Sequence, residues 1–160
     1  VRNLKNLNIT DKQIKKGITK IKSIARLQEI KNGKLKNLIK NNKLFVDGSH
    51  NSLGAKVLAD YLDTLNCKKH MILGMMLNKN HNEYLSYFKG KIDSLTIIDI
   101  PNQENAIGRK ELKNKLKLED LKINSEPSIQ EAISSIPLKD NEIIFITGSL
   151  YLVGEVLNVN

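Results

Sequence analysis

Short, wholly apolar runs alternate along the chain with longer stretches in which apolar residues recur three and four positions apart. The short runs are typical of strands buried on both faces, and the longer stretches are typical of amphipathic helices. This alternation predicts the α/β class, with a Rossmann-like, mainly parallel sheet covered by helices on both faces. The strands of this sheet are expected near Leu44, Met71, Leu95, Leu121 and Ile143.

The expected helices lie between and after these strands. They cover residues 52–62, 83–89, 108–116, 129–136 and 148–156. Ser128 and Glu131 have the spacing of a capping box at the start of one of them. Thr10 is expected to cap a further helix that runs toward Ile18.

The N-terminal part of the sheet is expected to be a short antiparallel hairpin, from Arg26 to Ile39. Residues 24–30 alternate imperfectly, as in a strand, and an Asn-Gly turn signal follows at 32–33. Residues 35–39 would then pair back on the first strand.

The strand near Leu44 runs directly into the segment 47–51, Asp-Gly-Ser-His-Asn, and then into a helix. Open α/β sheets bind ligands at such turns, outside the carboxyl ends of their strands. Asp47 could accept hydrogen bonds from ribose hydroxyls, while His50 and Asn51 lie at a helix start, which favours anions. The alternative is structural, because Asp and Asn commonly cap helices and Gly commonly forms turns.

The last strand repeats this arrangement. Residues 141–147 are mostly apolar, and Gly148 and Ser149 follow before the final helix. We expect this turn to place a hydroxyl and free N–H groups at the same edge of the sheet. The chain contains neither a phosphate-binding Gly-x-x-x-x-Gly-Lys-Ser/Thr loop nor a dinucleotide-binding Gly-x-Gly-x-x-Gly loop.

Composition and charge limit the number of domains and the classes of partner. The 160 residues suit one domain, and 26 Lys and Arg against 17 Asp and Glu give a net charge of +9. The lysines are spread over every segment without interleaved aromatic residues, so no nucleic-acid partner is expected.

Cys67 is the only cysteine, which excludes a disulfide framework, and we expect a buried or half-buried thiol. His70 is expected at the surface, and His81 in a capping or surface role.

No apolar run approaches the roughly 18 residues of a membrane span, and no signal peptide opens the chain. We therefore expect a cytoplasmic protein without a membrane partner, and a monomer. The chain begins at Val1, without Met, and is interpreted as a fragment of a longer protein.

Two motifs are specific enough to carry a family resemblance. The segment 47–51 resembles the Asp-Gly-Ala-His-Asn signature of the C-terminal domain of folylpolyglutamate synthases and dihydrofolate synthases, in the Mur ligase superfamily. This family usually has Pro at the position of Ser52. Residues 147–156 are similar to its Thr-Gly-Ser-Leu-Tyr-Leu/Phe-Val-Gly-Glu-Val motif.

Two further motifs are only partly present. Residues 26–28, Arg-Leu-Gln, match the end of the family's Trp-Pro-Gly-Arg-Leu-Glu/Gln signature. Residues 74–76, Gly-Met-Met, match another, but Lys79 and Asn80 stand where the family has Lys-Asp. The whole resemblance runs from about Thr10 to Val156.

The resemblance implies a ligase that uses ATP to convert a pteroyl or folyl carboxylate into an acyl phosphate, which the amine of L-glutamate then attacks. By resemblance, Arg26 and His50 would be catalytic, with Arg26 at the terminal phosphate. Asp47 would accept from the ribose, and Asn51 would also contact ATP. His50 and Ser149 would line the space between ATP and glutamate.

The resemblance also implies that the phosphate loop, the Mg²⁺ ligands and the folate pocket lie in a central ATPase domain outside this chain. Residues 1–22 would be a linker or tail of that domain, and residues 23–160 would form the Mur ligase-like C-terminal domain. Such a fragment is expected to be inactive alone. The alternatives are a non-catalytic nucleotide-binding module and an interaction domain that has lost its site. The residues do not separate dihydrofolate synthase from folylpolyglutamate synthase activity.

Overall fold

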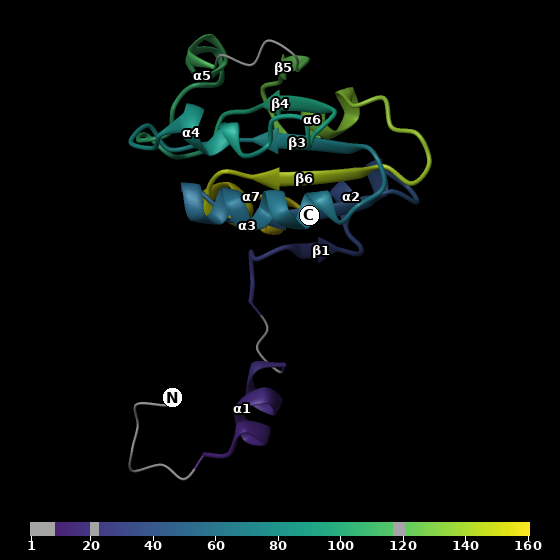
Figure 1. Cartoon of the computed structure of the whole chain (residues 1–160). Helices are drawn as coiled ribbons and strands as arrows, with labels where there is room; N and C mark the ends of the chain where they lie inside the picture. Colours follow the sequence, from purple (N-terminus) through teal and green to yellow (C-terminus); the bar gives the residue numbers. More distant parts are fainter. Residues whose placement is uncertain (1–8, 20–22, 117–120) are drawn as a thin grey trace.

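The computed structural model describes residues 9–19, 23–116 and 121–160, and its centre is a six-stranded sheet (Figure 1). The strands lie side by side in the order β1-β2-β6-β3-β4-β5. Their bounds are β1 Gln28–Ile30, β2 Lys43–Asp47, β3 Lys69–Leu73, β4 Ser94–Ile97, β5 Ile123–Ser125 and β6 Ile143–Thr147. Five strands are parallel and β1 pairs antiparallel with β2, which confirms the predicted α/β class with its mainly parallel sheet.

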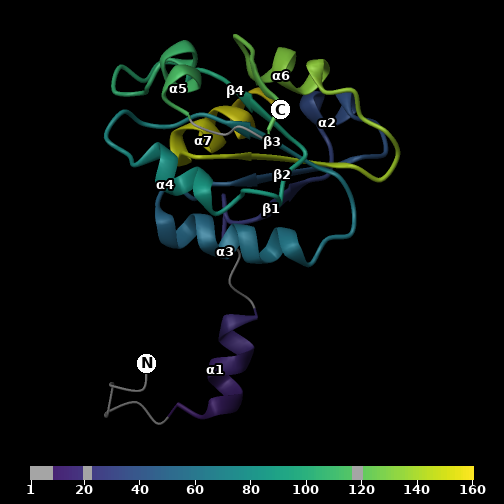
Figure 2. The ribbon, with the colours of Figure 1, turned by 45° about the horizontal axis from the view of Figure 1, so that its top comes forward.

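Helices cover both faces of this sheet. One face is covered by α3 (Ser52–Asp63), α4 (His81–Ser86) and α5 (Arg109–Lys115), and the other by α2 (Lys34–Leu38), α6 (Ile129–Ser135) and α7 (Leu150–Val159). Figure 2 shows α3 below the sheet and α2 and α6 above it. The helix α1 (Asp11–Ile18) contains no buried residue and is drawn apart from the sheet in Figure 1.

The central strands explain the wholly apolar runs in the sequence. Every residue of β6 is buried, because Ile143 and Phe145 pack under α3 while Ile144 and Ile146 pack on the opposite face. The rings of Phe45 and Phe145 stack across β2 and β6 with centroids 5.3 Å apart. This two-sided burial fixes β2 and β6 next to each other, and it fixes the turns that follow them.

The predicted hairpin from Arg26 to Ile39 is wrong in its second half. The segment expected to pair back is the helix α2, and β1 pairs with β2 instead, with Gln28 opposite Val46. The side chain of Asn160 accepts a hydrogen bond from the Leu35 N–H at 3.1 Å, and its carbonyl accepts from Lys34 at 2.8 Å. Asn160 thus caps α2, a contact that a local pattern does not reveal.

His70, expected at the surface, and His81, expected in a capping or surface role, are both buried. His70 is only 7% exposed, and its Nε2 lies 3.0 Å from a carboxylate oxygen of Glu142, which directly precedes β6. His81 is equally buried, and its Nε2 donates to the Met76 carbonyl at 3.0 Å. Asn80, not His81, caps α4 by accepting from the Glu83 N–H. Each imidazole has a hydrogen-bond partner, which for His70 is 72 residues away and for His81 five residues earlier.

Glu142 links this buried pair to the pH dependence of stability. Burial alone would raise the pKa of its carboxyl, but hydrogen bonds from the Lys139 N–H and from His70 together hold the pKa below the ordinary value of 4.5. Because the folded-state pKa is depressed, the stabilisation is complete above pH 4.5 and is lost as the pH falls through the lower, folded value.

Glu142→Gln is therefore expected to lower the free energy of unfolding most at neutral pH, with a difference from wild type that shrinks in acid. Urea titrations between about pH 7 and pH 3 measure this difference. The control is Glu104→Gln, because Glu104 is exposed. A Glu142→Gln deficit that is the same at every pH would contradict the assignment of this stabilisation to the ionised carboxylate.

Candidate functional site

Three turns meet at the carboxyl edge of the sheet. Asp47 at the end of β2 and Leu73 at the end of β3 both pair with Thr147 at the end of β6. The Gly148 N–H donates to the Ser49 carbonyl at 3.1 Å, which joins the turn after β2 to the turn after β6. The chain therefore leaves three neighbouring strands at one place, as expected for a site in an open α/β sheet.

Asp47 lies at the centre of these contacts and is 8% exposed. Its Oδ1 accepts from the Ser49 N–H at 2.8 Å, and its Oδ2 accepts from the Leu27 N–H at 2.7 Å. Asp47 does not cap the helix, because Asn51 does so by accepting from the Gly54 N–H at 2.9 Å. A carboxylate offers about four lone-pair sites, so both oxygens of Asp47 keep capacity for a ligand.

Arg26 is held on a strained loop beside Asp47. Its neighbours Ala25 and Leu27 have φ angles of 61° and 44°, which side-chain-bearing residues rarely adopt. The Ala25 carbonyl accepts from the Gly48 N–H at 2.7 Å, so this loop is tied to the turn after β2. Arg26 itself is exposed and has no ion-pair partner among the described residues.

His50 has a defined tautomer. Its Nδ1 lies 2.9 Å from the Gly48 carbonyl, which can only accept, so Nδ1 carries the proton. In the neutral ring the Nε2 atom is then a hydrogen-bond acceptor, and none of the described residues donates to it. His50 is half-buried and lines two cavities, so it is the residue that these cavities share.

The first cavity measures about 330 Å³ and combines polar and apolar walls. Its lining includes Arg26, Asp47, His50 and Asn51, together with residues of α3. The second measures about 740 Å³, and its lining includes His50, Lys79 and Ser149. The structure thus brings four of the predicted site residues to the first cavity. Ser149 lines the second cavity, which His50 also lines.

Ser149 and Gly148 differ in part from the expectation. Ser149 is 2% exposed and its hydroxyl accepts from the Tyr151 N–H at 3.1 Å, so it caps α7. The N–H of Gly148 is not free for a ligand, because Ser49 accepts it. Parallel pairing of β2 with β6 brings the two turns close enough to bond to each other.

Sequence reasoning missed a cluster of three buried hydroxyls beneath the site. Tyr84 of α4 lies 2.9 Å from both Ser49 Oγ and Thr147 Oγ1, and these two hydroxyls are 3.1 Å apart. Tyr84 is 1% exposed, and burial raises the pKa of its hydroxyl to about 12. The Ser49 hydroxyl stands where the resembled signature has an alanine methyl, and this was the available signal.

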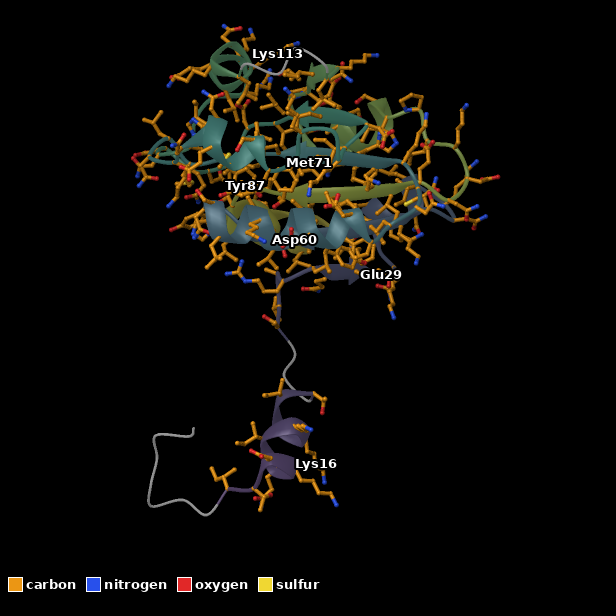
Figure 3. All side chains as sticks on the ribbon, viewed as in Figure 1. Lys16, Glu29, Asp60, Met71, Tyr87 and Lys113 are labelled. Carbon is orange, nitrogen blue, oxygen red and sulfur yellow. The ribbon has the colours of Figure 1, made fainter. Side chains whose placement is uncertain are left out.

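The positive charge of the chain is not concentrated at the site. Figure 3 places Lys16 on α1 and Lys113 on α5 at opposite ends of the picture. Among the described residues no group of three or more His, Cys, Asp or Glu side chains could hold a metal ion. No helix within the described ranges has the length and apolar character needed to span a membrane.

Solved structures share this fold. The E. coli FolC structure in complex with ADP has a TM-score of 0.77 and 19% identity, over 96% of this chain and 35% of that chain. A Yersinia pestis bifunctional folylpolyglutamate synthase/dihydrofolate synthase with AMPPNP and Mn ion has a TM-score of 0.77 and 16% identity, over 95% and 35%. The folylpolyglutamate synthase of Thermotoga maritima has a TM-score of 0.69 and 22% identity, over 97% and 36%.

The chain therefore spans about a third of the length of the structures that it matches. No curated protein matches its sequence. The family described as dihydrofolate synthetase, C-terminal domain, matches residues 28–159, which include both turns and every predicted site residue except Arg26. The chain belongs to the family of dihydrofolate synthetase C-terminal domains.

Proposed function

We propose that this chain is the C-terminal domain of an ATP-dependent ligase that adds L-glutamate to dihydropteroate or a folate. The domain closes over ATP bound to the rest of the enzyme and helps to bind glutamate. The observation that supports this most is the pair of cavities that meet at His50, because a ligase must hold a nucleotide and an incoming amino acid side by side.

The smaller cavity suits the nucleotide. Asp47 would accept from the ribose hydroxyls, and Asn51 and His50 would contact the phosphate side. Arg26 would reach the terminal phosphate as that group is transferred to the pteroyl or folyl carboxylate. Its guanidinium has no competing ion pair within the described residues, so it is available to stabilise the charge of the transferred phosphoryl group.

The larger cavity suits glutamate. Lys79 supplies a cation for a carboxylate, and Ser149 lies in the same wall. The Nε2 atom of His50 would accept a hydrogen bond from the glutamate amine and orient it toward the acyl phosphate. Attack by the neutral amine nitrogen on the acyl carbon forms the amide C–N bond and breaks the acyl C–O bond. Inorganic phosphate leaves and takes up the proton that the amine loses.

The remaining parts of such an enzyme would lie outside this chain. The chain contains no phosphate loop, and its described residues contain no metal-binding cluster, so the central domain of the parent would hold Mg²⁺ and most of the phosphate contacts. The metal would neutralise charge on the phosphates. We expect the parent to act in the cytoplasm as a monomer, on ATP, L-glutamate and a pteroate or folate.

The isolated chain is expected to show no ATP-dependent glutamate ligation and at best weak ATP binding, because it contains only part of this machinery. The assay contains ATP, Mg²⁺, glutamate and either dihydropteroate or tetrahydrofolate, and it measures phosphate release and product. The full-length parent is the positive control. Turnover by the chain above the enzyme-free blank would contradict the proposal that the central domain holds essential parts of the catalytic machinery. A folded but inactive parent would favour the non-catalytic alternative.

A further inference from the structure

We infer that Tyr84 is a positioning residue, whose buried hydroxyl holds the turn after β2 and the turn after β6 at a fixed separation. Tyr84 thereby fixes the position of His50 relative to Ser149, and both of these residues line the larger cavity. The effect on geometry follows from the contacts of this chain alone. The effect on ligation rests on the proposed function.

The three hydroxyls form a closed triangle between three elements. Ser49 comes from the turn after β2, Thr147 ends β6, and Tyr84 comes from α4, 35 and 63 residues away from them in sequence. All three side chains are at most 3% exposed. A buried hydroxyl is costly unless it is bonded, so moving any one of the three elements would leave polar groups unsatisfied.

The network includes the residues that immediately precede both site side chains. The Ser49 carbonyl, directly before His50, accepts from Tyr84 Oη at 3.2 Å and from the Gly148 N–H at 3.1 Å. Gly148 in turn directly precedes Ser149. The Tyr84 hydroxyl therefore contacts one turn through both backbone and side chain, and the other through the Thr147 hydroxyl.

A second contact ties α4 to the same turn. The Glu83 carboxylate accepts hydrogen bonds from Ser52 Oγ and from Asn80 Nδ2. Ser49 and Ser52, the two positions at which this turn departs from the resembled signature, thus bond to adjacent residues of α4. Because α4 follows the loop that carries Lys79, three of the loops around the larger cavity are linked through it, those after β2, β3 and β6.

The hydroxyl of Tyr84 remains a donor under all ordinary conditions. Burial raises its pKa to about 12, so it keeps its proton at neutral pH. The phenol then donates to the Ser49 carbonyl, and its oxygen accepts from the Ser49 and Thr147 hydroxyls. In this arrangement the three hydroxyl protons are all used, and the Ser49 and Thr147 oxygens, 3.1 Å apart, are neighbours without a proton between them. The Tyr84 hydroxyl can therefore act as a donor at neutral pH.

The first experiment uses the 160-residue chain. Tyr84→Phe keeps the ring that packs against Phe88 and removes the hydroxyl. It should speed hydrogen exchange at the Gly148 amide roughly tenfold or more relative to the Phe145 amide inside β6, because the turn opens locally. The control Tyr87→Phe removes a half-buried phenol that has no hydrogen bond among the described residues, and it should leave this ratio unchanged.

Equal acceleration at Gly148 and Phe145 would show that Tyr84 contributes only to global stability, and would overturn the proposal. Ser49→Ala is expected to give an intermediate ratio. It leaves both the Tyr84–Thr147 bond and the bond from Tyr84 to the carbonyl of residue 49 in place.

The second experiment uses the full-length parent. Tyr84→Phe should lower kcat roughly tenfold or more while KM for ATP stays within about twofold, because misplacement across the larger cavity slows amide formation more than it weakens nucleotide binding. Wild-type kcat in Tyr84→Phe would overturn the catalytic part. If the wild-type parent does not ligate at all, the proposed function fails, and the exchange ratio alone decides whether Tyr84 positions the turns.

Discussion

Gly148→Ala is expected to destabilise the domain by about 3 kcal/mol or more, because two costs add at this turn. Gly148 has a φ of +104°, a conformation that costs a side-chain-bearing residue roughly 1–2 kcal/mol. A methyl group there would also lie 2.6 Å from the Gly74 carbonyl oxygen and 2.7 Å from Leu73 Cδ1. The nearest of these contacts is backbone, so it cannot move aside as a flexible side chain would.

Two other glycines separate these costs. Gly90 has a φ of +71° with nothing within 4 Å of an added methyl, so Gly90→Ala should show the conformational cost alone. Gly154 lies in α7 with equally open space, and Gly154→Ala should be neutral or stabilising by up to about 1 kcal/mol. Urea unfolding of the three variants gives the comparison. A Gly148→Ala protein as stable as Gly90→Ala would show that the turn relaxes around the methyl.

Asp47→Asn is expected to lower both the stability of the domain and the activity of the parent. Each carboxylate oxygen accepts a backbone N–H from a different segment, so one of these donors would face the amide NH₂ in the variant. Leaving a buried donor unsatisfied costs about 1–3 kcal/mol. Loss of the charge would also weaken the proposed bonds to the ribose, and ligation should fall roughly tenfold or more.

The two effects of Asp47→Asn are measured separately. Urea unfolding of the chain gives the stability change, and ligation is assayed in the parent at a temperature where circular dichroism shows that the variant is folded. Asp60→Asn is the matched control, since it removes only an exposed pair with Lys56 and should leave the stability close to that of wild type. Normal ligation by a folded Asp47→Asn parent would remove Asp47 from the nucleotide site.

The fold could be predicted from the sequence because its signals are local. The strands β2, β3, β4 and β6 are buried on one or both faces and appear as apolar runs, and Asp47 and Thr147 mark the ends of two of them. The prediction failed at α2, since Leu35 and Ile39 fit a strand as well as a helix. The start of α2 is capped by Asn160, which lies 125 residues beyond Leu35.

The site was predictable in its residues more than in its bonds. The turn after β2 was identified from its sequence, but no local pattern indicates that Asp47 bonds to Leu27, 20 residues earlier. Burial of His70 depends on Glu142, which is 72 residues away. The hydroxyl triangle is hidden for the same reason, because Tyr84 and Thr147 each look like an ordinary core residue until the sheet brings them together.

The position of β6 has a consequence for how the protein is made. This strand lies between β2 and β3. Lys43 pairs with Ile143, so the sheet cannot be completed before residue 143 is available. Pairings so distant in sequence slow folding, and chains are synthesised from the N-terminus. On the ribosome the first five strands would emerge as two groups that cannot pair with each other, with apolar edges exposed. The domain and its candidate site would form together, in a single late step, after β6 has been released.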